Sequence, residues 1–175
     1  MKKARTLILL RHAKSRHGTG ETDHDRPLAP RGKKDMTRIG AYLHEHALVP
    51  ELVLCSTAVR ARQTVTLLAE NTGLDSDRIV FIPDLYAASA EGILNTLETA
   101  PADVTCLMAV AHNPGMEDLA RLLAGDVFPH DKLPTGTAAC FETTADNWGR
   151  IAPENTVLKD FVRTKKKKKT KKKTS

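Results

Sequence analysis

Long apolar runs are missing from this 175-residue chain, and none approaches the roughly 20 residues that a helix needs to span a bilayer. The chain begins with Met1-Lys2-Lys3, and the apolar block that follows at residues 7–10 is too short for the core of a secretory signal peptide. From these two absences we expect a cytoplasmic protein without a transmembrane segment.

Cysteine is also scarce. Cys55, Cys106 and Cys140 form an odd set without C-x-x-C spacing, and each lies in an apolar, strand-like context. We therefore expect reduced thiols inside the core. His17 and His24 lie near aspartates in a polar loop, but no spacing typical of metal ligands recurs. The sequence therefore predicts neither a bound metal nor a cofactor.

Acidic residues are absent from the last eleven positions, where Lys165–Lys169 and Lys171–Lys173 supply eight positive charges. The formal net charge of the whole chain is +6, so the remainder carries −2 and gives no sign of a nucleic-acid groove. We predict one domain over residues 1–163 and a disordered Lys-rich tail over residues 164–175. This tail either solubilises the chain or binds anionic surfaces or nucleic acid non-specifically.

Apolar, strand-like stretches alternate regularly with amphipathic, helix-like ones. The predicted strands are Thr6–Leu10, Leu52–Cys55, Ile79–Ile82, Thr105–Ala111, Thr137–Phe141 and Trp148–Ile151. The first predicted helix runs from about Arg31 to Ala47, and the second follows a cap at Ser56 or Thr57 and ends at about Asn71. The third follows a cap at Ser89 and extends through Leu97, and the fourth runs from Pro114 to Leu123. This order predicts a three-layer α/β/α sandwich with a mostly parallel central sheet.

Polar residues follow three of the predicted strands at the point where each strand ends. Arg11 and His12 follow the first strand, and Arg60 lies in the first turn after the second. His112 and Asn113 follow the strand that ends near position 111. Because parallel strands place their carboxyl ends together, and ligands of open α/β sheets bind there, these side chains are expected to share one pocket.

Two histidines and two arginines in one pocket suit phosphoryl transfer. Arginine forks match phosphate oxygens bidentately, and a neutral imidazole can attack phosphorus and hold the phosphoryl group covalently. A second, protonated histidine adds a donor to the same oxygens, and the helix that begins after Pro114 offers backbone N–H groups. Such a site works by positioning and electrostatics and requires no metal.

Several motifs together resemble the histidine phosphatase superfamily, and within it the SixA-type phosphohistidine phosphatase branch. In chain order they are Leu9–Ser15, Asp25–Leu28, Arg31-Gly32, Ser56–Thr64, Asp84–Tyr86 and Val110–Gly115. The resemblance covers about residues 5–161 and implies a phosphoglycerate-mutase-like fold. It implies that His12 is the nucleophile that becomes phosphorylated. It also implies that Arg11, Arg60 and His112 complete the phosphate pocket.

Other site residues follow less directly. Many members of the superfamily use a carboxylate after the third strand as proton donor, and Asp84 is the nearest match. The proton can also come from solvent or from the substrate imidazole. Asn113 and Ser15 are further candidates to bind phosphate, although Ser15 could instead shape the turn. Arg26 is expected either near the rim of the pocket or paired with a neighbouring aspartate.

The segment between Gly73 and Thr105 has room for one strand and one helix, so we expect no large cap insertion. An uncapped site is shallow and open, and suits a side chain presented by another protein. We therefore predict a phosphohistidine phosphatase that acts on a phosphorylated protein. The alternatives are a phosphatase of small phosphomonoesters and a non-catalytic phosphate-binding module.

Overall fold

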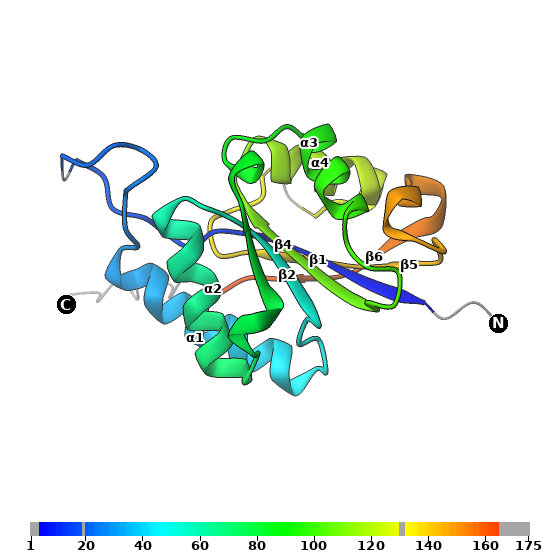
Figure 1. Ribbon diagram of the computed structural model, residues 1–175, viewed down its shortest axis with the longest axis horizontal. Helices are drawn as coiled ribbons and strands as arrows, with labels where there is room; N and C mark the ends of the chain where they lie inside the picture. The colour runs from blue at the N-terminus through cyan, green and yellow to red at the C-terminus, as the bar shows by residue number, and fades with distance from the viewer. Residues whose placement is uncertain (1–3, 19, 130–131, 165–175) are drawn as a thin grey trace, which may run out of the picture.

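Residues 4–18, 20–129 and 132–164 are described in the computed structural model. They form a six-stranded sheet in the order β3-β2-β4-β1-β5-β6 (Figure 1). The strands are β1 (Arg5–Arg11), β2 (Leu52–Ser56), β3 (Ile79–Ile82), β4 (Cys106–Ala111), β5 (Ala138–Thr143) and β6 (Thr156–Val162). The α-helices are α1 (Pro30–Glu45), α2 (Val59–Thr72), α3 (Ala90–Glu98) and α4 (Gly115–Ala124).

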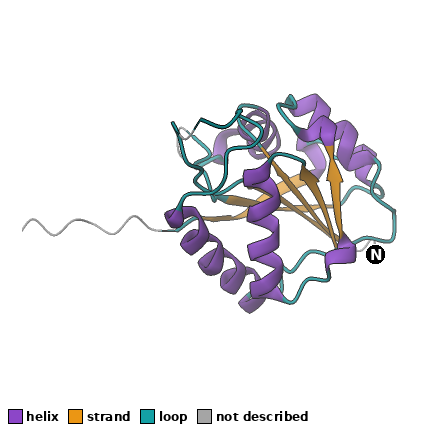
Figure 2. Cartoon of the chain, turned by 60° about the vertical axis from the view of Figure 1, so that its left-hand side comes forward, coloured by secondary structure: helices purple, strands orange, loops and turns teal. Residues whose placement is uncertain are grey.

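The layers are those expected from the sequence. Strands β1 to β4 run parallel to one another, and β5 runs antiparallel to both of its neighbours, β1 and β6. Helices α1 and α2 cover one face of the sheet, and α3 and α4 cover the other (Figures 1 and 2). The predicted α/β/α sandwich with a mostly parallel sheet is therefore confirmed. The predicted absence of a large cap also holds, because α2 and β4 are separated by β3, α3 and short turns.

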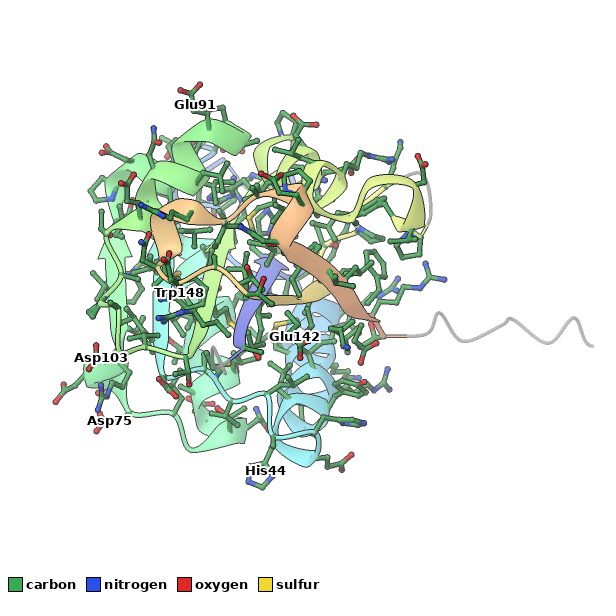
Figure 3. The ribbon with its side chains drawn as sticks, turned by 90° about the vertical axis from the view of Figure 1, so that its right-hand side faces the viewer. His44, Asp75, Glu91, Asp103, Glu142 and Trp148 are labelled. Carbon is green, nitrogen blue, oxygen red and sulfur yellow. The ribbon has the colours of Figure 1, made fainter. Side chains whose placement is uncertain are left out.

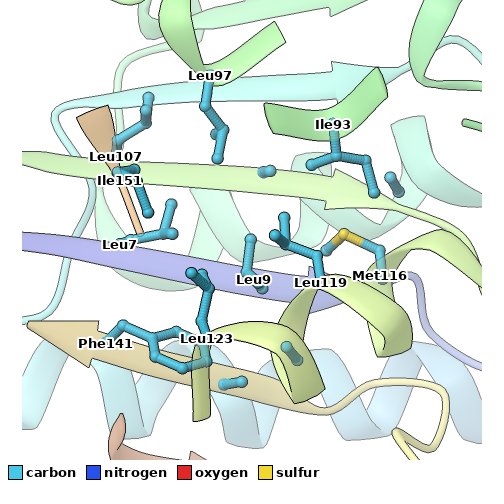
Figure 4. Close-up of a cluster of buried hydrophobic side chains, with 14 of the residues drawn as sticks. Leu7, Leu9, Ile93, Leu97, Leu107, Met116, Leu119, Leu123, Phe141 and Ile151 are labelled. Carbon is cyan, nitrogen blue, oxygen red and sulfur yellow. The ribbon is translucent and has the colours of Figure 1, made fainter. Parts of the chain in front are cut away.

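Strand β1 supplies both hydrophobic cores by simple alternation. Leu7 and Leu9 point into the core under α3 and α4, which Figure 4 shows in detail. Ile8 and Leu10 point into the opposite core, under α1 and α2. A strand buried on both faces needs an unbroken apolar run, and this explains the sequence that precedes Arg11.

Most helices begin and end near the capping and glycine residues that the sequence places there. Gly73 ends α2 with a left-handed φ of 73°, and the Ser89 hydroxyl accepts the Gly92 N–H at the start of α3. The predicted start of α2 is wrong. Ser56 is the last residue of β2, and α2 begins only at Val59, without a side-chain cap.

The predicted final strand, Trp148–Ile151, is also wrong. Residues 148–150 form a 3₁₀ turn in which the Asn147 side chain accepts the Gly149 N–H, and the last strand is β6. Trp148 is only 1% exposed and belongs to the core under α3 and α4, rather than packing at a sheet edge (Figure 3). The sequence pattern does not predict β6, because Lys159 and Asp160 interrupt the apolar residues of this edge strand.

Two further sequence predictions concern the C-terminal tail and membrane-spanning helices. The Lys-rich tail, beyond Thr164, lies outside the described residues, so its predicted disorder and anion binding stay predictions. None of the helices in the described ranges combines the length and apolar character of a membrane span.

Candidate active site

A cavity of about 310 Å³ lies where β1, β2 and β4 end. Arg11 is the last residue of β1, Arg60 lies in the first turn of α2, and His112 directly follows β4. The lining side chains are Arg11, His12, Lys14, Ser15, His17, Asp23, Arg26, Arg60, His112, Asn113 and Thr135. The parallel sheet thus brings together the two histidines and two arginines that the sequence placed in one pocket.

The contacts of His12 fix its tautomer. Its Nδ1 lies 2.8 Å from the Ala13 carbonyl oxygen, which can only accept a hydrogen bond. Its Nε2 lies 3.2 Å from Arg60 Nε, which can only donate one. Burial, reinforced by the positive charges of His112 and Arg60, lowers the pKa of His12 from 6.5 to about 3. The ring is therefore neutral at physiological pH, with its lone pair on Nε2.

His112 lies beside His12, with 5.0 Å between the ring centroids. Its Nε2 is 2.7 Å from the Ser56 hydroxyl, whereas its Nδ1 is buried and has no hydrogen-bond partner among the residues that the structure describes. Burial and the positive charge of Arg60 lower the pKa of His112 from 6.5 to about 4. A bound dianion opposes these effects, because a negative charge favours the protonated ring. His112 can therefore gain a proton when an anion enters the cavity.

Two other side chains of the cavity also have buried polar atoms without partners. They are Arg11 Nε and Asn113 Oδ1. The opposite ends of both side chains are anchored, since Arg11 Nη1 and Asn113 Nδ2 donate to the Leu133 carbonyl at 2.9 and 3.1 Å. Buried polar groups are nearly always paired in folded proteins. An unpaired donor, Arg11 Nε, and an unpaired acceptor, Asn113 Oδ1, on fixed side chains therefore indicate a place for a polar ligand.

Asp23 holds the outer end of the Arg60 guanidinium. The two Nη groups of Arg60 donate to Asp23, Nη2 to a carboxylate oxygen at 3.1 Å and Nη1 to the carbonyl. Tyr86 donates its hydroxyl to the same carboxylate at 2.7 Å, and Arg26 forms an ion pair with it at 2.9 Å. These bonds, that of Tyr86 foremost, hold the pKa of Asp23 well below its usual range.

Sequence reasoning missed this carboxylate in the cavity. The only signal was the position of Asp23 three residues before Arg26, a spacing that also suits an ordinary surface ion pair. Arg26 itself meets both expectations, since it lines the cavity and pairs with Asp23. The role of Tyr86 had no separable signal, because its partner lies 63 residues away in the chain.

The remaining candidates divide between the cavity and the surface. Ser15 is 5% exposed, lines the cavity, and accepts a hydrogen bond from Arg26 Nη1 at 3.0 Å. His17, which the sequence places in a loop, lines the rim and accepts from the same Nη1 at 3.0 Å. Asp84 is exposed on a 3₁₀ turn and is not among the lining side chains. Its position therefore gives no support to the role of proton donor.

Across the residues that the structure describes, no three His, Cys, Asp or Glu side chains are grouped in a way that could hold a metal ion.

Comparison with known proteins places the chain in a family. Residues 7–112 match the model of the histidine phosphatase superfamily, branch 1, and the chain belongs to this superfamily. An uncharacterized protein of Mycobacterium tuberculosis is 34% identical over 160 residues, which are 87% of this chain and 98% of that protein.

Two solved structures narrow the class further. The SixA protein of Nakamurella multipartitia, assigned as a phosphohistidine phosphatase, is 30% identical with a TM-score of 0.79, over 92% of this chain and 96% of that one. The corresponding protein of Agrobacterium tumefaciens is 30% identical with a TM-score of 0.77, over 91% and 98%. The protein is thus a phosphatase of the SixA-type branch.

Proposed function

We propose that this phosphatase removes the phosphoryl group from a phosphorylated histidine of another protein, through a phosphohistidine formed on His12 and without a metal ion. The observation that carries the proposal is the neutral His12 ring, fixed by Ala13 and Arg60 beside Arg11 and His112. A neutral imidazole with a defined lone pair is a competent nucleophile toward phosphorus.

The first step transfers the phosphoryl group to the enzyme. His12 Nε2 attacks phosphorus, the bond from phosphorus to the substrate nitrogen breaks, and its electron pair stays on that nitrogen, which takes a proton from solvent or carries one already on its ring. As Nε2 bonds to phosphorus, it can no longer accept the hydrogen bond from Arg60 Nε. Arg60 Nε keeps its hydrogen and donates this bond to a phosphoryl oxygen instead. Arg11 and Arg60 then offset the charge on the equatorial oxygens.

The second step returns the enzyme to its starting state. A water attacks the phosphoryl group in line, the bond to His12 Nε2 breaks, and inorganic phosphate leaves. The electron pair of the broken bond returns to Nε2, where Arg60 Nε can again donate. His112 takes up a proton while the anion is bound and donates to its oxygens, and Asn113 and Ser15 offer further polar contacts at the wall of the cavity.

The open rim supports a protein as substrate. Lys14 and His17 line the cavity and are exposed, and α2 is followed by only one strand and one helix before β4, too little chain for a cap. An imidazole presented on a protein surface can enter such a site. The names of the SixA relatives support phosphohistidine as the group that is hydrolysed.

A small phosphomonoester is the second candidate substrate. A volume of about 310 Å³ is at the lower end of the range for small-molecule sites, roughly 300–1,000 Å³. The third candidate, a phosphate-binding module without turnover, is favoured by no feature of the cavity, because binding alone does not require a neutral nucleophile.

One experiment compares the candidates. Turnover of a phosphohistidine protein and of a panel of small phosphoesters is measured for the natural chain, for His12→Ala and for the surface control His44→Ala. We expect preference for phosphohistidine, an acid-labile phosphoryl label on the enzyme, and loss of both in His12→Ala alone. Full activity of His12→Ala, loss of activity on chelation, or a strong preference for one sugar phosphate would each contradict the proposal.

We place this activity in the cytoplasm. The support is that Cys55, Cys106 and Cys140 are all free thiols. Reducing compartments keep thiols in this state.

A further inference from the structure

Positive charge is concentrated in the part of the chain that surrounds the cavity. Residues 11–38 contain eight Lys and Arg but only four Asp and Glu. Over the rest of residues 1–164 the balance reverses, with eleven basic and seventeen acidic residues. Figure 3 looks at the end of the molecule away from the cavity, where Asp75, Asp103 and Glu142 are labelled. The segment that supplies seven of the cavity-lining residues is therefore net positive, whereas the rest of residues 1–164 is net negative.

Helix α1 carries four of these eight basic residues, all on its solvent side. Its buried residues are Gly32, Asp35, Met36, Ile39, Gly40 and Leu43, which leaves Arg31, Lys33, Lys34 and Arg38 exposed. The only acid of the helix before Glu45 is Asp35, which is buried and lies 3.6 Å from Arg31. Lys33, Lys34 and Arg38 form no ion pair with any residue that the structure describes.

The first turn of α1 is joined directly to the rim of the cavity. The Lys14 carbonyl accepts the Ala29 N–H at 2.8 Å, and a Cβ added at Gly32 would lie 2.3 Å from that same oxygen. Only glycine permits this approach of the helix to the strand–loop junction. Lys14 lines the cavity, and Lys33 and Lys34 are exposed in the turn of α1 that contains Gly32, with Arg38 one turn further along the helix. We refer to Lys14, Lys33, Lys34 and Arg38 as the basic face.

We propose that the basic face docks an acidic segment of the protein whose phosphohistidine enters the cavity. The inference rests on the proposed function and adds the chemistry of the partner: carboxylates that flank or face the phosphorylated histidine. The cavity neutralises the phosphoryl group itself, so unpaired cations beside it are available for other anions of the same partner. Complementary charge of this kind speeds encounter and selects partners more than it changes the chemical step.

A nucleic acid is the less suitable partner for this face. Proteins that bind single strands combine cations with exposed aromatic rings on which bases stack. The one aromatic residue of α1, Tyr42, stacks on His46 at 3.8 Å and donates its hydroxyl to Asp160. The basic face therefore offers charge without a stacking platform.

The test compares two phosphohistidine peptides, one with acidic and one with neutral flanking residues, together with a small phosphoester. The variant Lys33→Gln/Lys34→Gln removes two charges of the basic face, and the control Arg78→Gln/Arg150→Gln removes two exposed charges elsewhere. We expect the KM for the acidic peptide to rise about three- to tenfold in the first variant, as for two exposed ion pairs, with kcat unchanged. The neutral peptide, the small ester and the control variant should show no change, and salt should abolish the difference.

Each other result counts against the proposal. Equal KM values for the two peptides overturn the docking role while leaving the proposed function intact. A parallel loss of small-ester turnover shows that the substitutions act on the cavity, which also overturns the docking role. Salt-sensitive oligonucleotide binding that the variant loses, without an effect on the peptides, assigns the face to nucleic acid. Failure of the natural chain to hydrolyse either peptide overturns the proposed function and the docking role together.

Discussion

His12 has an acceptor-only neighbour at one ring nitrogen and a donor-only neighbour at the other. The Ala13 carbonyl and Arg60 Nε leave one tautomer that satisfies both contacts. Burial keeps this ring neutral, because burial disfavours the charged ring more strongly than the hydrogen bond to Ala13 favours it. A neutral His12 ring with its lone pair on Nε2 is therefore a property of the free protein and does not depend on a bound substrate.

The protonation state of His12 is directly measurable. In nitrogen NMR spectra at pH 6, we expect a neutral His12 ring with its hydrogen on Nδ1, because its pKa lies near 3. Addition of inorganic phosphate should raise the pKa of His112, because a bound anion favours the protonated ring and opposes the effects of burial and of Arg60. A charged His12 ring at pH 6, or a hydrogen on Nε2 in the free enzyme, would show that the nucleophile is not prepared in advance.

Asp23 is the residue whose substitution should separate positioning from binding. Asp23→Asn keeps a polar side chain and the backbone carbonyl that accepts from Arg60 Nη1, but it removes the charge that holds Arg60 Nη2. We expect kcat to fall about tenfold, since a misplaced guanidinium no longer matches the equatorial oxygens.

Asp25→Asn is the matched control for Asp23→Asn. Asp25 lies two residues away, is exposed, and binds Thr22 and His24 instead of an arginine. Its substitution should leave kcat unchanged. If both variants lose activity equally, the loss comes from a change in the loop that contains both residues. The hydrogen bond between the Asp23 carboxylate and Arg60 is then not important for activity.

Secondary-structure elements meet at the cavity through close backbone approaches. A Cβ at Gly115, the first residue of α4, would lie 2.0 Å from the Ala88 carbonyl oxygen, just before α3. The start of α4 directly follows His112 and Asn113, so its docking against that loop also sets the position of these side chains. Glycine is needed here for space and not for an unusual backbone angle.

Gly115→Ala should therefore destabilise the protein by about 2 kcal/mol or more, because the clash is with backbone that cannot rotate away. It should also reduce kcat by moving His112. Gly92→Ala, within α3, is the control, since its nearest contacts would be side-chain atoms at 3.5 Å and alanine favours helix. Urea denaturation of both variants gives the comparison. Equal stability of the two would mean that the loop before α3 adapts to the added methyl group.

On the scale of the whole molecule, folding keeps His12 and His112 neutral at pH values where the same rings are protonated in the unfolded chain. The pKa of His12 is lowered from 6.5 to about 3 and that of His112 to about 4. Unfolding exposes both rings, so below pH 6.5 the unfolded state binds protons that the folded state does not. Their stabilising contribution is complete above pH 6.5 and is lost as the pH falls, to about 4 for His112 and to about 3 for His12.

Between pH 7 and pH 5 we expect the free energy of unfolding to fall, by roughly 1–2 kcal/mol for each of these histidines. Saturating phosphate should offset part of the loss, since the anion favours the protonated His112 ring. The variant His12→Gln/His112→Gln should show a shallower pH dependence, whatever its stability at pH 7. An unchanged slope in that variant would assign the acid sensitivity to other groups.

The sequence by itself determined the layers of the sheet and the side chains delivered at the strand ends. Leu7–Leu10 is apolar at every position because β1 is covered on both faces, and Arg11 and His12 follow because that is where the covering ends. The edge strand β6 and the buried turn at Trp148 escaped prediction, since a half-exposed edge tolerates charge and a turn can bury a large ring.

Only the tertiary structure decided which donors and acceptors face each other in the cavity. His12 and its neighbour Arg60 are 48 residues apart along the chain. Asp23 is 37 residues from Arg60 and 63 residues from Tyr86. No local pattern encodes such contacts. They arise because a parallel sheet returns each strand to the same edge, where loops of different origin share one anion-binding space.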